Sequence, residues 1–467
     1  MNKKNINVPL PNEKKPTKKI NVLLPNEKKP TKKNNVLLSN EKKPTKVMKK
    51  NNNIIKYIDL CCGIGGFRIA LEKYGKENNI IFECVLSADI KDDALKTYNL
   101  NFNENNEKTD IMELDEISKF DMLCAGFPCQ PFSSAGTKKG FDDKRGGIIF
   151  KIIDIVKKYT PEHVILENVP NLSSLNNGKD LEKICKEFEN IGYNVSYKKL
   201  NSKNFGIPQN RERLFIICNK TKKINLENIE LKPNAILTDI IDTTAKYTDI
   251  DEEFAKKIID LHNITPLYGY KMQDKRGGNH NIHSWDLSLN GIISDDEKLL
   301  MTKIMTERRK KHWAEKKNID WMDGMPLTYD EILTFYDNTK LKKMLNNLVS
   351  KKYLVLEKPK KLEGKKRVID ENGIAGYNIC KGKLSFPISN ILDPNDITPT
   401  LTATDSSKLA VIIDNKYLRK LTDNELKLLC GFPKSYQIPK NVNKYDLFGN
   451  MAIPTVIEGI LQCIFGN

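Results

Sequence analysis

The chain has 467 residues, enough for two or three domains with separate cores, and its formal charge is +17. No apolar stretch approaches the roughly 18 residues of a membrane-spanning helix, and the lysine-rich start lacks the apolar segment of a secretory signal, so we expect no membrane contact. Ten cysteines and five histidines without metal-ligand or disulfide-framework spacing argue against a structural metal site and favour a reducing, cytoplasmic location.

The first 50 residues contain a 14-residue repeat, written INVPLPNEKKPTKK at 6–19, INVLLPNEKKPTKK at 20–33 and NNVLLSNEKKPTK at 34–46. This segment holds 15 lysines and 3 glutamates, a net charge of +12, so the other 417 residues carry only +5. A proline in each unit interrupts any helix. The composition predicts a disordered basic arm that attracts phosphate groups non-specifically. A duplication without function stays open as the alternative.

From about residue 54, short apolar runs alternate with amphipathic stretches. The apolar runs predict buried strands at 54–60, 80–90, 121–127, 163–168 and 213–218. One amphipathic stretch ends at Gly75. The clearest helix is a stripe of apolar residues at Leu181, Ile184, Cys185, Phe188 and Ile191, closed by Gly192. Strands that alternate with helices predict an α/β fold with a doubly wound, mainly parallel sheet.

Residues 221–416 differ in composition and pattern, because they are polar, rich in lysine and without a regular alternation of apolar runs and amphipathic stretches. They predict a second, smaller domain. Within this region, residues 327–357 predict two short helices followed by a strand, the pattern of a small winged-helix-like insert.

The stretch DLCCGIGGF (59–67) places three glycines between a strand and a helix. Such a turn lets backbone N–H groups approach a ligand at the helix N-terminus. The pattern G-x-G-G differs from the G-x-G-x-x-G of dinucleotide sites, so NAD is not favoured. Asp89 ends the next strand, 24 residues after Gly65, where an acid usually grips a ribose diol. A glycine turn alone is often structural, but the turn together with this acid favours a ligand site.

The stretch GFPCQPFSSAG (126–136) follows an apolar strand at the edge where doubly wound sheets bind ligands. Cys129 lies in a turn between two prolines, where a thiol is exposed and partly ionised, so it is a candidate nucleophile. Cys124, on the strand itself, is expected to pack in the core.

Two further motifs carry charged side chains. In HVILENVP (163–170), Glu167 ends an apolar strand, so lost hydration should raise its pKa. The alternative is a glutamate that caps the next element. In PQNRERLFIIC (208–218), Arg211 and Arg213 lie two residues apart and therefore on one face of a strand. They could hold an anion or the exocyclic oxygen of a base, or simply pair at the surface.

In this order, the motifs resemble the cytosine-C5 DNA methyltransferases of bacterial restriction–modification systems. The likeness covers about residues 54–220 and 417–467, and includes RKLTDNELKLLCGFP (419–433) and GNMAIPTVIEGI (449–460). PTLTATD (399–405) resembles the Thr-Leu element of the target recognition domain. Three positions depart from the family pattern: Cys61 replaces a common aromatic residue, GNM replaces GNS, and Asp89 replaces a more frequent glutamate.

The resemblance implies methyl transfer from S-adenosylmethionine to C5 of a flipped-out cytosine in a specific double-stranded DNA sequence, without a metal. It implies that Cys129 adds to C6, that Glu167 holds or protonates N3, and that Arg211 and Arg213 anchor the base and the loop. The implied cofactor-binding residues are Asp59, Cys61, Gly63, Gly65, Gly66, Phe67, Asp89, Ile90, Asp110, Ile111, Phe127, Pro128 and Asn450. The implied DNA-binding residues are Gln130, Ser133, Gln209, Thr400 and Leu401.

The predicted domains are then basic repeats at 1–50, a catalytic and cofactor-binding domain at 51–228, a target recognition domain at 229–440, and a returning C-terminal helix at 441–467. We expect a monomer, and a cognate restriction endonuclease acting on the same site is a possible partner. Two alternatives stay open: a tRNA cytosine-5 methyltransferase, and a catalytically silent DNA-binding regulator.

Overall fold

The computed structural model describes residues 53–128, 147–274, 276–320, 324–364, 366–380 and 386–466. Its helices are α1 (Gly66–Asn78), α2 (Asp92–Phe102), α3 (Gly147–Tyr159), α4 (Lys179–Asn190), α5 (Glu252–Ile264), α6 (Asp295–Glu307), α7 (His312–Lys316), α8 (Tyr329–Leu333), α9 (Leu341–Ser350), α10 (Asp423–Leu429), α11 (Lys444–Gly449) and α12 (Pro454–Phe465). Its strands are β1 (Asn53–Leu60), β2 (Ile80–Ala88), β3 (Met122–Gly126), β4 (His163–Asn168), β5 (Asn194–Asn201), β6 (Glu212–Asn219), β7 (Lys271–Met272), β8 (Asn281–Ile282), β9 (Leu354–Glu357), β10 (Lys360–Glu363), β11 (Lys366–Ile369), β12 (Gly376–Ile379), β13 (Asn390–Ile391), β14 (Leu409–Ile413) and β15 (Tyr417–Lys420).

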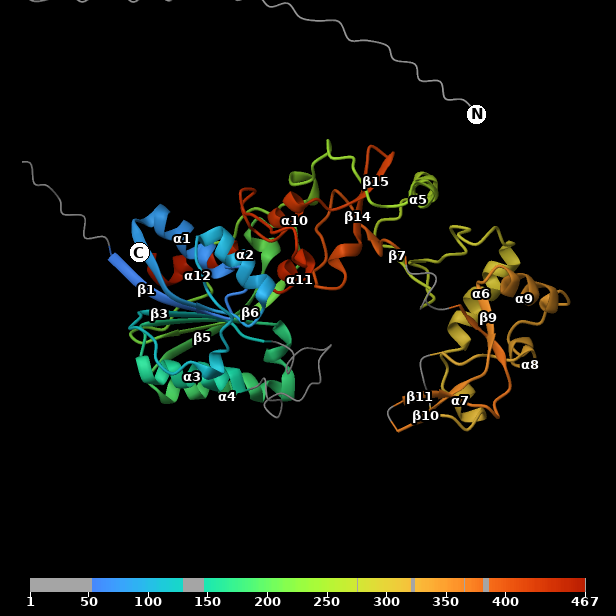
Figure 1. Cartoon of the computed structure of the whole chain (residues 1–467), viewed down its shortest axis with the longest axis horizontal. Helices are drawn as coiled ribbons and strands as arrows, with labels where there is room; N and C mark the ends of the chain where they lie inside the picture. Colours follow the sequence, from blue (N-terminus) through green and yellow to red (C-terminus); the bar gives the residue numbers. More distant parts are fainter. Residues whose placement is uncertain are drawn as a thin grey trace, which may run out of the picture. The chain divides into compact units, whose positions relative to one another are not determined.

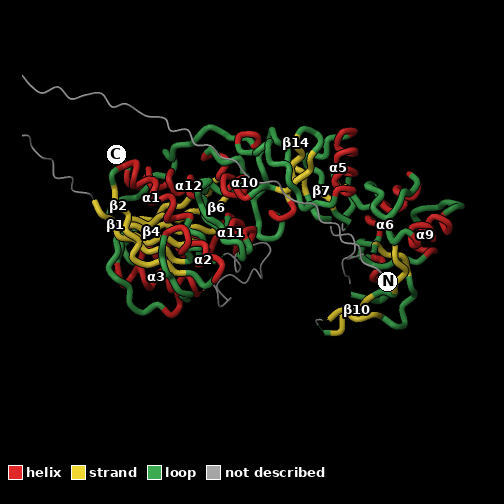
Figure 2. Tube along the Cα trace, turned by 45° about the horizontal axis from the view of Figure 1, so that its top comes forward, coloured by secondary structure: helices red, strands yellow, loops and turns green. Residues whose placement is uncertain are grey.

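Six strands form the largest sheet among the described residues, in the order β2-β1-β3-β4-β6-β5. Figure 2 shows this sheet as a group of yellow strands. The first four run parallel, whereas β6 runs antiparallel to both β4 and β5. The predicted α/β fold with a doubly wound, mainly parallel sheet is confirmed. Each of the five predicted strands is present within two residues of its expected ends. The strand β5 was not expected, because its sequence NVSYKKLN is largely polar.

Helices cover both faces of this sheet, with α1 and α12 on one side and α3 and α4 on the other (Figure 1). Alternation along β3 divides the two cores. Met122 and Cys124 pack with residues of α1 and α12, while Leu123 and Ala125 pack with residues of α3 and α4. Cys124 is fully buried, so its predicted packing role is confirmed.

The end predicted for the first helix is wrong, because α1 continues through Gly75 to Asn78. A Cβ at Gly75 would lie 2.4 Å from the carbonyl oxygen of Ile80, so this glycine lets β2 pass close to the helix instead of ending it. The helix predicted around Leu181 is α4, and Gly192 follows it with a left-handed φ of +90°.

The C-terminal segment returns to the six-stranded sheet. The expectation that no stretch approaches membrane-spanning length is wrong for Lys444–Phe465, which is long and apolar enough by length and composition, but most of this segment is buried. Its helix α12 contributes Val456, Ile457, Ile460 and Leu461 to the core beside α1. Packing against the sheet therefore accounts for its apolar character.

Between β6 and α10 the chain builds two further cores. One contains α5 and the five-stranded sheet β15-β14-β13-β7-β8. The other contains α6, α7, α8 and α9 with strands β9 and β12. The two short helices and the strand predicted within 327–357 are present as α8, α9 and β9. The proposed domain boundaries at 228 and 440 stay predictions.

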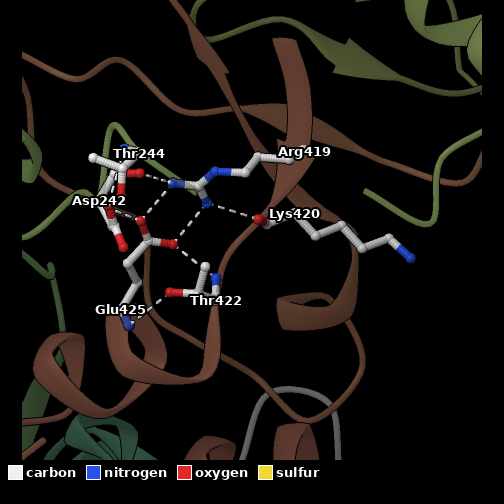
Figure 3. A network of polar contacts seen from close by, with 6 residues as sticks. All are labelled: Asp242, Thr244, Arg419, Lys420, Thr422 and Glu425. Carbon is white, nitrogen blue, oxygen red and sulfur yellow. Dashed lines mark hydrogen bonds and ion pairs between the residues drawn. The ribbon is translucent and has the colours of Figure 1, made fainter. Parts of the chain in front are cut away.

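A buried ion pair joins the segment around Asp242, which follows β6, to the segment from β15 to α10 (Figure 3). The Arg419 guanidinium donates to both carboxylate oxygens of Glu425 at 2.7 and 2.8 Å, and to the Asp242 carbonyl at 2.8 Å. The same carboxylate accepts the backbone N–H groups of Asp242 and Thr422 at 2.9 and 2.7 Å. Because every carboxylate oxygen has protein donors, this pair is part of the scaffold.

Candidate active site

The carboxyl ends of β1, β2, β3 and β4 meet at one edge of the parallel sheet. Open α/β sheets bind ligands outside this edge. Most of the predicted site residues follow these four strand ends, and β6 begins beside β4 because it runs antiparallel to it.

The glycine turn after β1 is held by Asp89, the residue that follows β2. Asp89 is buried, and its carboxylate accepts the N–H of Gly63 at 2.9 Å and that of Lys91 at 2.8 Å. Gly63 has a φ of +55°, and a Cβ there would meet nothing within 4 Å. A Cβ at Gly66 would lie 2.1 Å from the Ala452 carbonyl, so this glycine allows the C-terminal segment to close on the turn.

Asp59, near the end of β1, is fully buried, and neither of its carboxylate oxygens has a hydrogen-bond partner among the described residues. Burial, followed by the charge of Asp89, raises the pKa of Asp59 well above its ordinary value, against the lowering effect of Arg68. The neighbouring Cys61 has a left-handed φ of +54°. Desolvation and the charges of Asp89, Asp59 and Asp110 raise the pKa of the Cys61 thiol, so it stays protonated.

The other predicted cofactor residues divide into buried and exposed groups. Phe67, Ile111 and Phe127 are buried in the two cores, Gly65 has a φ of +80°, and Pro128 is partly buried. Ile90 is 53 % exposed directly after Asp89.

Two exposed polar residues of this set are held by neighbouring groups. The Asp110 carboxylate accepts the N–H of Met112 at 2.9 Å. The Asn450 amide donates to the Asp446 carboxylate at 2.8 Å, and Asp446 pairs with Lys91 at 2.9 Å. Lys91 is the residue whose N–H binds Asp89, so the C-terminal segment is linked to the glycine turn.

Glu167, near the end of β4, is about 9 % exposed and forms an ion pair with Arg213 at the start of β6. The Arg213 Nε lies 3.1 Å from Glu167 Oε1, in an alignment that falls short of a hydrogen bond. Burial raises the pKa of Glu167, although the charges of Arg213 and Arg211 lower it. The predicted rise is confirmed.

The end of β3 lies beside the Glu167 carboxylate. Gly126 is the register partner of Glu167, and the Asn168 amide donates to the Phe127 carbonyl at 3.2 Å. Cys129, Gln130 and Ser133 lie outside the described residues. Asn168 was not predicted as a site residue. The sequence signal for Asn168 is its position directly after Glu167 in HVILENVP (163–170).

Arg211 is buried and faces the protein, unlike Arg213. Its guanidinium donates to the carbonyls of Leu401 at 3.2 Å, Gly449 at 3.1 Å and Met451 at 2.8 Å. It therefore joins the returning segments to the start of β6, and the geometry supports a positioning role in place of contact with a base.

The predicted DNA contacts at Gln209 and Leu401 find no support in this geometry, because both side chains are fully buried. The Gln209 amide donates to the Leu429 carbonyl at 2.6 Å and accepts the Leu401 N–H at 3.1 Å. The Thr400 hydroxyl donates to the Asn210 carbonyl at 2.5 Å. The PTLTATD element thus pairs with the PQNRER segment.

Three features lie at the ligand edge of the mainly parallel sheet: the glycine turn bound by Asp89, the buried Asp59 carboxylate without a hydrogen-bond partner among the described residues, and the Glu167–Arg213 pair. Together with the sheet, they define a protein of the S-adenosylmethionine-dependent methyltransferase fold. Within the described residues, no group of three or more His, Cys, Asp or Glu is placed to hold a metal ion.

Comparison with known proteins identifies the family within this fold class. Residues 55–466 match the model of the C-5 cytosine-specific DNA methylases, and the chain belongs to this family. It is 42 % identical over 419 residues to the type II methyltransferases M.NlaIV of Neisseria lactamica and M.NgoBV of Neisseria gonorrhoeae, covering 87 % of this chain and 98 % of each relative. It is 36 % identical over 436 residues to M.BanI of Aneurinibacillus aneurinilyticus, covering 88 % and 96 %. The chain is a DNA cytosine-5 methyltransferase of the type II restriction–modification kind.

Proposed function

We propose that this methyltransferase modifies a flipped-out cytosine within a specific duplex sequence, through a covalent bond between Cys129 and C6. The observation that carries the proposal is the Glu167–Arg213 pair. It lies beside the end of β3, three residues before Cys129 in the sequence. A buried carboxylate with a raised pKa is suited to share a proton with N3 of a cytosine.

The glycine turn and Asp59 fit S-adenosylmethionine, the methyl donor of the family. Its ammonium and sulfonium groups are cations, and the two unpartnered oxygens of Asp59 would be stabilised by a cation. The open space at Gly63 leaves room for a ligand, and the exposed Ile90 offers an apolar surface for adenine beside Asp89. When bound, S-adenosylmethionine supplies an electrophilic methyl group.

The protein's own groups make C5 reactive. The Cys129 thiolate forms a bond to C6 of the cytosine while Glu167 donates a proton toward N3, so that the C5–C6 electron pair becomes nucleophilic at C5. After C5 has gained the methyl group, the proton at N3 returns to Glu167, and C5 loses its own proton to a base. The electron pair released at C5 restores the C5–C6 double bond as the bond to the Cys129 sulfur breaks. Arg213 orients Glu167 and the base, and Arg211 holds the segments around them.

The substrate class follows from the family and from the recognition region. Residues 221–416 far exceed what the chemistry needs, and sequence-specific reading of duplex DNA requires elements that enter a groove. We propose that the chain acts as a cytoplasmic monomer and that a restriction endonuclease cleaves the same sequence when it is unmethylated.

Methyl incorporation into a duplex DNA pool and into tRNA, measured side by side, tests this function. Transfer to duplex DNA supports the proposal, whereas transfer to tRNA alone, or to neither, contradicts it. Bisulfite sequencing of DNA from cells that express the protein would then define the methylated sequence.

A further inference from the structure

The lobe around α9 has the element order of a winged-helix DNA-binding module. The helices α6 and α7 are followed by an extended residue, Leu327, then by α8, α9, β9, the β10–β11 hairpin and β12. Leu327 exchanges two backbone hydrogen bonds with Tyr377 of β12, at 2.7 and 3.0 Å, and β12 pairs antiparallel with β9. Apart from the one-turn helix α7, the order is a helix, an extended bridge residue, two helices, a strand, a hairpin and a strand.

The lobe has its own core, which holds α9 by one face. Leu341, Met344, Leu345 and Leu348 of α9 are buried with Trp285, Leu300 and Tyr353. The amide of Asn347 donates to the Glu297 carboxylate of α6 at 2.7 Å, which sets the rotation of α9. These contacts fix the orientation of α9, and therefore which of its residues form the outer face.

The outer face of α9 is polar and basic. Lys342, Lys343, Asn346 and Ser350 are exposed, at the spacing of one helix face. The hairpin that follows exposes Lys360, Lys366 and Arg367. Residues 340–367 contain ten lysines, one arginine and two glutamates, a net charge of +9, which exceeds the +5 carried by all residues after position 50.

One exposed carboxylate, Glu363, lies on the hairpin, but four others lie on or next to α6 and α8. Asp295 and Asp296 are exposed at the start of α6, and Asp330 and Asp337 are exposed on and after α8. The lobe therefore presents net positive charge through α9 and the hairpin, and negative charge through the first turn of α6 and through α8; Lys310 and Lys311, after α6, are exposed as well. A polyanion is attracted to the first of these surfaces and repelled by the second.

We propose that this module binds the target DNA, with α9 in the major groove and the β10–β11 hairpin on the flanking backbone. The inference rests on the proposed duplex substrate and adds the element that reads it. An α-helix fits the major groove, lysines neutralise phosphates, and an asparagine can bond an adenine edge. We assign Lys342 and Lys343 to phosphates and Asn346 to a base.

The experiment compares full-length variants that melt like the wild type. In Lys342→Ala/Lys343→Ala, we expect at least about tenfold weaker binding to the target duplex at moderate salt, and a slope of log K against log salt reduced by about two. The matched control is Lys298→Ala/Lys310→Ala. It removes two lysines of the same lobe that already pair with Asp295 and Glu307, and should change neither quantity.

Asn346→Ala tests base reading. We expect the preference for the target over singly substituted sites to fall by roughly five- to a hundredfold at one position, with the salt slope unchanged. If Lys342→Ala/Lys343→Ala keeps the wild-type slope, or Asn346→Ala keeps the wild-type preference, the module does not read DNA as proposed. Absence of any duplex methylation by the wild type would instead overturn the proposed function.

Discussion

Two buried pairs of arginine and glutamate in this protein differ in how completely the carboxylate is satisfied. Glu425, about 1 % exposed, accepts two hydrogen bonds on each oxygen, from Arg419 and from two backbone N–H groups (Figure 3). Glu167, about 9 % exposed, has among the described residues the imperfectly aligned Arg213 near Oε1 and no hydrogen-bond donor to that oxygen. The residues and the charges are the same, but the remaining acceptor capacity is not.

This difference separates scaffold from site. A buried carboxylate that is fully bonded to its own protein has nothing to offer a substrate, and removing its partner leaves an uncompensated charge. A buried carboxylate with spare lone pairs and a raised pKa is poised to exchange a proton with a bound group. The two pairs should therefore respond in opposite ways to substitution, one in stability and the other in catalysis.

The largest expected effect is at Cys129, three residues after the end of β3 in the sequence. DNA carrying cytosine with fluorine at C5 should trap the enzyme covalently when S-adenosylmethionine is present, because the methylated adduct has no C5 proton to lose. Cys129→Ser should abolish this denaturation-resistant complex, since an alcohol is far less ionised than a thiol near neutrality. Gel electrophoresis under denaturing conditions measures the trapped fraction.

Cys124→Ser is the matched control for that experiment. Cys124 is fully buried on β3, so the variant should still be trapped, with lower stability as its only cost. Trapping that persists in Cys129→Ser, or that disappears in a folded Cys124→Ser, would remove Cys129 as the nucleophile.

Glu167→Gln should lower kcat by about a hundred- to ten-thousandfold, the usual range for loss of a proton-transfer group. The matched control is Glu162→Gln, just before the other end of β4, where the carboxylate only accepts from the Thr221 hydroxyl. That variant should turn over like the wild type. Equal losses in the two variants would mean that β4 is sensitive to any substitution.

The difference in stability between the wild type and Glu167→Gln should also depend on pH. Because burial raises the pKa of Glu167 in the folded protein, its stabilising contribution is complete below the unfolded pKa of about 4.3 and is lost as the pH rises through the folded pKa. The glutamine variant has no such loss. Its melting temperature should therefore gain on that of the wild type as the pH rises from about 4 toward neutrality.

The scaffold pair should give the opposite result. Arg419→Met should lower the free energy of unfolding by about 3–5 kcal/mol, because it leaves the Glu425 charge buried without its partner. Arg419→Met/Glu425→Met should recover much of this loss in urea denaturation. Lys186→Ala, which breaks the exposed pair with Glu182, should change stability little. A double variant no more stable than the single one would mean that the pair itself contributes the energy.

The sequence predicted one of these pairs better than the other. Apolar runs located β1, β3, β4 and β6, and the position of Glu167 at a strand end was sufficient to expect its raised pKa. The Arg419 network was missed, although the spacing of Thr422 and Glu425 is that of a helix capping box, which the structure confirms at α10. Sequence spacing identifies such a cap, but not the buried arginine that reaches it from β15.

Long-range contacts explain the other features that the sequence did not predict. Arg211 and Arg213 are equivalent by strand alternation, yet three carbonyls from distant segments surround only Arg211. Gly75 looks like a helix end, but its role depends on the approach of β2. The edge strand β5 pairs only with β6, so it has a partly exposed pattern that apolar runs cannot reveal.

The Asp89 carboxylate is intermediate between the fully bonded Glu425 and the partly bonded Glu167. Each of its oxygens accepts one backbone N–H and keeps a spare lone pair. Asp89→Ala should weaken calorimetric binding of S-adenosylmethionine by about 1.5–3 kcal/mol, the loss of a charge-assisted hydrogen bond. Asp93→Ala is the control, since among the described residues that nearby carboxylate accepts the Asn443 N–H at 3.1 Å and does not contact the glycine turn. Unchanged affinity in a folded Asp89→Ala would remove this residue from the cofactor site.

The N-terminal repeats carry charge that is expected to attract DNA without a defined binding geometry. Deleting them should have the smallest effect of the changes considered. Their net charge of +12 should attract DNA through counterion release alone. Deleting residues 1–50 should therefore leave turnover and site preference intact, while it weakens association at low salt and flattens the slope of log K against log salt. Because salt screens such contacts, the difference should vanish at high ionic strength. A truncated chain with the wild-type slope would show that the repeats do not contact DNA. A truncated chain with altered site preference would show that they do more than attract phosphate.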